Sequence, residues 1–115
     1  MDLNLTRIGQ ILFGLTFLGF GISHLVFADN MAGIVPLPGG VIWVYLTGIA
    51  QILAFVSIVI KKKTRLACLL LALMLLIFIL TIHLKSAMSG DLTGFLKDLG
   101  LMGAALVIAN QFGND

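Results

Sequence analysis

The sequence predicts an all-α fold, an integral membrane four-helix bundle that forms one transmembrane domain over residues 1–115. Hydrophobic residues make up 60% of the chain and charged residues only 10%. The mean hydropathy is +1.15. Water-soluble domains carry about a quarter charged residues, so a chain of this composition would leave too much apolar surface exposed to water. The solvent that fits it is lipid.

Four segments are long enough to cross the hydrocarbon core, which takes about 20 residues of helix at about 1.5 Å each. Three of them contain no charge, and the fourth carries Lys97 and Asp98 in its second turn. The predicted helices are residues 8–28, 41–60, 66–84 and 92–112. We expect the first to be a retained span, because its apolar stretch is longer than that of a usual signal peptide.

The segments between the helices contain residues that end or reverse a helix. Pro36 and Pro38 follow the first helix, and both disfavour helical continuation. The charged stretch Lys61–Arg65 leaves room only for a tight reversal. Asp91 is a candidate N-cap for the last helix. The chain therefore predicts short connections and antiparallel neighbours.

The basic residues predict the orientation of the bundle. Four of the seven lie in the connection of residues 61–65, which the positive-inside rule places in the cytoplasm. With four spans running up, down, up and down, both termini lie there too, together with Arg7. Only Lys85 and Lys97 remain on the outer side.

Three titratable residues are expected at one depth near the outer boundary. His24 and His83 lie near the outer ends of the first and third helices, which run in the same direction. The fourth helix runs inward, so Asp98 near its start reaches the same level. We interpret this convergence as a polar pocket below the outer surface.

Small and polar residues recur at helical spacing on two of the helices, where they would face other helices. The stripe on the first helix is Gln10, Gly14, Phe17, Gly21 and His24. That on the second is Val44, Thr47, Gly48, Gln51 and Ala54. An unpartnered amide in mid-membrane costs a few kcal/mol, so Gln51 should point inward. The ligand-binding candidates are therefore His24, Gln51, His83 and Asp98.

Each candidate also has a purely structural explanation. A histidine at a helix end contacts lipid headgroups in many membrane proteins. Asp98 can lie in the outer interface beside Lys97, with the two side chains on different faces of the helix. Gln51 can serve as a simple hydrogen-bonding contact between helices.

Several classes of function are disfavoured. The single cysteine, Cys68, permits no intrachain disulfide or redox pair and is expected to pack in the interior. We identify no catalytic set and no metal site. The basic residues cluster beside an apolar segment, which indicates membrane topology rather than nucleic-acid binding. Trp43 and Tyr45 are expected to anchor the outer interface.

The pattern as a whole resembles the DoxX-like family of small four-helix bacterial membrane proteins. The likeness covers nearly the full chain and rests on short motifs: Arg7-Ile8-Gly9, Gly19-Phe20-Gly21-Ile22-Ser23-His24, the proline-containing outer loop, Gly48-Ile49-Ala50-Gln51-Ile52-Leu53 and the run from Lys97 to Ala104. The resemblance implies a multi-pass protein of the bacterial cytoplasmic (inner) membrane. Some relatives take part in respiratory chemistry with quinones. Many members carry glutamate where this chain has Gln51, and an amide does not exchange protons.

Three functions remain open at this stage. The first is a redox-linked membrane subunit that binds a quinone, with His24, His83 and Gln51 as hydrogen-bonding groups and Asp98 orienting a histidine. The second is a b-type haem protein with the two histidines as axial ligands. The third is a noncatalytic assembly subunit whose partners are other membrane or redox subunits, or a second copy of the chain. In each, the chain is an accessory or ligand-binding component rather than a self-contained enzyme.

A small proton-coupled exporter also fits the length and the four predicted spans. Such an exporter needs a membrane carboxylate that exchanges protons. The chain contains no glutamate, and the first three predicted spans hold no aspartate away from their ends. The sequence therefore favours the other three functions.

Overall fold

The computed structural model describes residues 4–31 and 40–113, and every regular element in this part of the chain is helical. The elements in order are α1 (Leu5–Val26), α2 (Ala28–Met31), α3 (Gly40–Ile60), α4 (Thr64–Phe78), the π-helical turn η2 (Ile79–His83), α5 (Leu84–Met88) and α6 (Thr93–Gln111). The predicted helix-breaking residues Pro36 and Pro38 lie outside the described residues.

Three helical segments of the described chain are long and apolar enough to cross a membrane: Leu5–Val26, Gly40–Ile60 and Thr64–Met88. This confirms the prediction of a helical protein, and the three segments indicate a membrane protein. The fourth long helix, α6, is not among the three. Lys97 and Asp98 lie in its second turn and lower its hydropathy.

The third predicted helix continues past residue 84, where the sequence analysis ended it. The chain passes from α4 through η2 into α5 without a break, and the turn that ends α5 is built around Gly90, at φ 104°. The amide of Asp91 donates to the carbonyl of Ser86 at 3.0 Å, and that of Gly90 to the carbonyl of Ala87 at 3.0 Å. These two bonds form a Schellman motif, which needs a left-handed residue at the position of Gly90.

Local side-chain bonds fix two other helix starts. The Asn4 side chain accepts from the amide of Arg7 at 2.8 Å, so α1 begins three residues earlier than predicted. The Asp91 carboxylate accepts from the amide of Thr93 at 3.1 Å. Asp91 thus satisfies a donor of the first turn of α6, the role expected of it, although Leu92 is the residue at the N-cap position.

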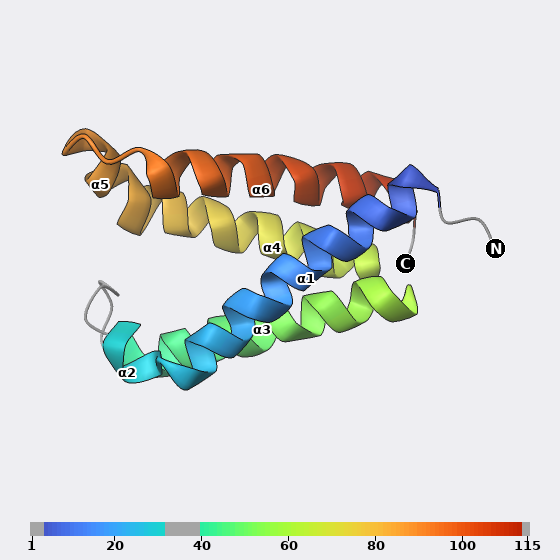
Figure 1. Cartoon of the computed structure of the whole chain (residues 1–115), viewed down its shortest axis with the longest axis horizontal. Helices are drawn as coiled ribbons and strands as arrows, with labels where there is room; N and C mark the ends of the chain where they lie inside the picture. The colour runs from blue at the N-terminus through green and yellow to red at the C-terminus, as the bar shows by residue number, and fades with distance from the viewer. Residues whose placement is uncertain (1–3, 32–39, 114–115) are drawn as a thin grey trace.

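The helices pack mainly in two pairs, α1 with α3 and α4 with α6 (Figure 1). In the first pair Gly21 and Gly48 let the backbones meet: a Cβ on Gly21 would lie 2.7 Å from the Gly48 carbonyl oxygen. Eight of the ten residues in the stripes predicted for these helices are buried, and His24 and Thr47 are half-buried. Small residues therefore set the closest approach.

The half of the molecule near the α3–α4 turn is densely packed and closed by polar contacts. Its buried core includes Ile58, Cys68 and Ala109. The Arg7 guanidinium donates to the carbonyls of Ile58 and Val59, both at 2.9 Å, and so caps the end of α3. Basic side chains are favourable at helix C-termini, where carbonyls lack partners.

The ends of α1 and α6 join the same cluster. Gln10 donates to Gln111 at 2.8 Å, and Arg65 donates to the carbonyl of Ala109 at 3.4 Å. The start of α1, the α3–α4 turn and the end of α6 therefore lie together at one end of the molecule, on the right in Figure 1. The two helix pairs separate toward the opposite end.

Candidate functional site

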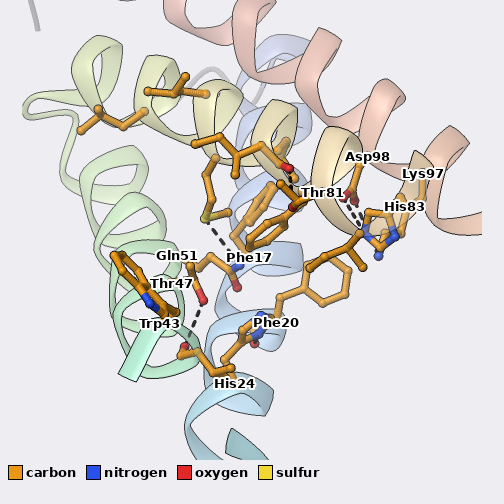
Figure 2. Close-up of a pocket in the computed structure, with 18 residues that line it drawn as sticks. Phe17, Phe20, His24, Trp43, Thr47, Gln51, Thr81, His83, Lys97 and Asp98 are labelled. Atoms are coloured by element: carbon orange, nitrogen blue, oxygen red, sulfur yellow. Dashed lines mark hydrogen bonds and ion pairs between the residues drawn. The ribbon is translucent and has the colours of Figure 1, made fainter. Parts of the chain in front are cut away.

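A cavity of about 500 Å³ lies between the two helix pairs, on the side away from the basic turn. Apolar and aromatic side chains form most of its wall, and a few polar groups interrupt them (Figure 2). Residues on its wall include Phe17, Phe20, His24, Trp43, Thr47, Gln51, Met74, Phe78, Thr81, His83, Lys97 and Asp98. The four residues predicted from the sequence, on four different helical segments, all line this one cavity.

His24 lies in the last turn of α1 and is half-buried. Its Nδ1 atom is 2.6 Å from the carbonyl oxygen of Phe20, one turn earlier. A carbonyl only accepts, so Nδ1 carries the hydrogen in this contact. In the neutral ring, Nε2 is then the acceptor atom. His24 thus offers the cavity an acceptor held in place by its own helix.

His83 and Asp98 form the polar contact between η2 and α6. Nε2 of His83 lies 2.9 Å from Oδ2 of Asp98, whose side chain is only 3% exposed. The ring N–H does not point along this line, so Oδ2 has ion-pair proximity without an aligned hydrogen bond. A small rotation of the His83 ring would turn this contact into a hydrogen bond.

The ring of His83 also packs closely against Gly94 of α6. A Cβ added to Gly94 would lie 2.8 Å from Cε1 of His83 and closer still to Nδ1. Gly94 and Asp98 are four residues apart and share a face of α6. Together they form a slot that only a glycine at position 94 leaves open. His83 is the last residue of the five-residue π-helical turn η2. This turn sets the direction in which the His83 ring leaves the helix. Such turns recur at functional sites.

Lys97 lies on the cavity wall beside Asp98. Its Nζ is 3.7 Å from Oδ1 of Asp98 and 4.8 Å from the centre of the Phe20 ring. The long lysine side chain bends back over its own helix and reaches α1. The buried carboxylate thus has a cationic neighbour, and Asp98 itself is not at an exposed interface.

Gln51 is the deepest polar group on the α3 side and is 2% exposed. Its Nε2 atom lies 3.9 Å from the sulfur of Met74, a weak acceptor, and its Oε1 atom has no partner in the described structure. The hydrogen bond between helices that was expected of Gln51 is therefore made only to the thioether of Met74. A buried carbonyl without a partner costs about 1–3 kcal/mol, which calls for a functional explanation.

The cavity opens along one side of α4. Lining residues Leu70, Leu73 and Ile77 remain about half exposed, at 56%, 53% and 48%, and recur at helical spacing. Trp43 on α3 is 44% exposed across the opening. In a protein surrounded by lipid, this opening faces hydrocarbon rather than water.

Trp43 and Lys97 are among the lining residues that were not predicted as part of a site. Trp43 was assigned to an interfacial anchor, yet it precedes Thr47 and Gln51 by four and eight residues and therefore shares their helix face. That spacing could have revealed it. Lys97 gave no such signal, because its position depends on the bend of a flexible side chain.

The geometry does not fit the two histidines as axial haem ligands. The His83 ring is packed against α6, with Nε2 2.9 Å from Oδ2 of Asp98 and Nδ1 close to Gly94. Ligation by Nε2 would separate the ring from a buried carboxylate. Among the described residues, no three His, Cys, Asp or Glu side chains are grouped to hold a metal ion. The polar groups instead fit hydrogen bonding to an organic ligand.

No family model, curated protein or solved structure matches the chain. The likeness to DoxX-like proteins therefore stays a prediction from the motifs, and the function has to be argued from the cavity.

Proposed function

We propose that this chain is a redox-linked membrane subunit of the DoxX-like type that binds a quinone or a similar amphipathic ring in the cavity between its helix pairs. The observation that carries the proposal is the apolar cavity, open toward lipid, whose lining includes His24, Gln51, His83 and Asp98. A volume near 500 Å³ lies within the usual range for small-molecule sites, about 300–1,000 Å³.

The proposed setting is a four-helix bundle in the bacterial cytoplasmic membrane, with α6 as the fourth span. The outer side of α6 supports this, because Leu96, Leu99, Leu106 and Val107 are exposed. Its one buried carboxylate faces the bundle interior beside His83 and Lys97, which lowers the cost of inserting it.

The charge distribution supports the proposed orientation. Arg7, Arg65 and the three lysines of the α3–α4 turn lie at the packed end, and Lys85 and Lys97 lie toward the cavity end. The positive-inside rule then places both termini in the cytoplasm and the cavity near the periplasmic boundary.

The form of the opening favours a ligand that arrives from the bilayer. The exposed lining residues on α4 are aliphatic, and the polar groups lie deeper. An isoprenoid or alkyl tail can therefore remain in lipid while a ring occupies the cavity. This arrangement separates the apolar and polar parts of one ligand in the way a quinone requires.

A cavity-filling variant tests the proposal. Thr47→Phe places a phenyl ring inside the cavity and leaves all four polar residues in place. We expect it to weaken binding of decylubiquinone at least tenfold, which can be followed by quenching of Trp43, the single tryptophan. Ile49→Phe on the exposed side of α3 is the matched control and should bind as the wild type does.

Replacing both His24 and His83 by alanine should also abolish binding. Unchanged quinone binding in Thr47→Phe and in the double-histidine variant would exclude this site. Retention of partner subunits by a chain that binds no ring would instead support the assembly role.

A further inference from the structure

Several hydrogen-bond donors on the cavity wall are already used within the protein. Thr47 donates to the carbonyl of Val44 at 3.0 Å, and Thr81 donates to that of Ile77 at 2.7 Å. The Nδ1 hydrogen of His24 is directed at Phe20, and the amide group of Gln51 at Met74. Trp43 has an interaction partner as well. Lys97 retains donors, but it lies over Phe20 beside Asp98.

The acceptors on the same wall are not used to the same extent. Oε1 of Gln51 and Oδ2 of Asp98 are both buried and lack an aligned donor in the described structure. Nε2 of His24 is a third acceptor when the ring is neutral, because Nδ1 holds the hydrogen. The orientation of the Gln51 amide is supported by Met74, because the reverse orientation would direct a carbonyl oxygen at sulfur lone pairs.

A cavity wall with unused hydrogen-bond acceptors favours a ligand that donates hydrogen bonds. A quinone ring presents only carbonyl acceptors, and these would face Gln51 Oε1 without a hydrogen between them. A quinol or other phenol presents hydroxyl groups that can donate to the same atoms. A cationic ligand is less well matched, because Asp98 already has Lys97 and His83 as neighbours.

We propose that the cavity selects the reduced, hydroxyl-bearing form of an amphipathic aromatic ring over the oxidised, carbonyl-bearing form, with Gln51 Oε1 as the deep acceptor. This inference rests on the proposed function and narrows it to one redox form. It concerns binding alone and requires no electron transfer within this chain.

The test compares decylubiquinol with decylubiquinone on the purified full chain in detergent micelles, under anaerobic conditions. Equilibrium dialysis followed by chromatographic quantification avoids the optical differences between the two forms. We expect the quinol to bind about tenfold more tightly, the effect of one hydrogen bond to a buried acceptor. Gln51→Leu should remove this preference by weakening quinol binding, and Ile49→Phe, on the exposed side of α3 and outside the cavity lining, should keep it.

The outcomes separate the two proposals. Equal or tighter binding of the quinone by the wild type would overturn the selection and leave the proposed function standing. A preference that survives in Gln51→Leu would overturn the role of Gln51. Failure of both ligands to bind would overturn both proposals.

Discussion

Gly94 controls the position of the His83 ring, because the ring occupies the space where any other residue would place its Cβ. Gly94→Ala should push the imidazole off α6 and away from Asp98. We expect a loss of about 1–3 kcal/mol in unfolding free energy from overpacking, despite the higher helix propensity of alanine. Thermal unfolding in detergent micelles measures it.

Gly103→Ala is the control on the same helix, because a Cβ at Gly103 meets nothing within 4 Å. It should leave stability unchanged or raise it by up to about 1 kcal/mol. Equal melting temperatures for the two variants would show that His83 does not depend on Gly94.

The two buried glutamines should respond in opposite ways to substitution. Oε1 of Gln51 has no partner, so Gln51→Leu should stabilise the ligand-free protein by about 1 kcal/mol. Gln10 donates to Gln111 at 2.8 Å and accepts from Arg7 at 3.2 Å, so Gln10→Leu should destabilise it. Chemical or thermal unfolding of both variants without ligand gives the comparison, and a loss in both would refute the unpaired state of Gln51.

At the level of helices, the α1–α3 contact depends on two facing glycines. Gly21→Ala would place a Cβ 2.6 Å from Cγ1 of Ile52 and 2.7 Å from the Gly48 carbonyl oxygen. The backbone cannot move aside locally, so the helices must separate, at a cost of about 1–3 kcal/mol. Gly19→Ala meets nothing within 4 Å and should not change the unfolding midpoint. An unchanged midpoint in Gly21→Ala would contradict this packing.

The helix positions could be predicted from the sequence, because the thickness of the bilayer sets the length of a membrane-spanning helix and small residues mark the faces that pack against other helices. The prediction of 41–60 differs from α3 by one residue for this reason. The end of the third helix did not follow, because apolar composition stops at Leu84 whereas the backbone continues until Gly90 supplies a left-handed turn. The π-turn before His83 likewise has no compositional signal in ILTIH.

For the molecule as a whole, the orientation and the fourth span can be tested by labelling. Cys68 is fully buried, so single-cysteine variants can be built in a Cys68→Ala background. Met88→Cys should react with an impermeant maleimide on cells whose outer membrane is permeabilised. Lys62→Cys and Asn110→Cys should react only after the inner membrane is opened. Reaction of Asn110→Cys together with Met88→Cys would show that α6 does not cross.

The candidate site was predictable to the extent that helix direction and depth determine it. Opposite directions of neighbouring spans were enough to predict a common depth for His24, His83 and Asp98, and all three line the cavity. The surplus of acceptors was not predictable, because it depends on which donors turn back to their own helices. The contact of Gln51 with the Met74 thioether and that of Lys97 with Asp98 also depend on side-chain conformation, so they were not predictable either.

The most direct test of the cavity as a ligand site is mass analysis of the chain released from its own membrane in mild detergent. The wild type should retain a neutral aromatic molecule that Thr47→Phe fails to retain and Ile49→Phe keeps. A wild-type chain that carries only phospholipid, in amounts that Thr47→Phe does not change, would contradict the account.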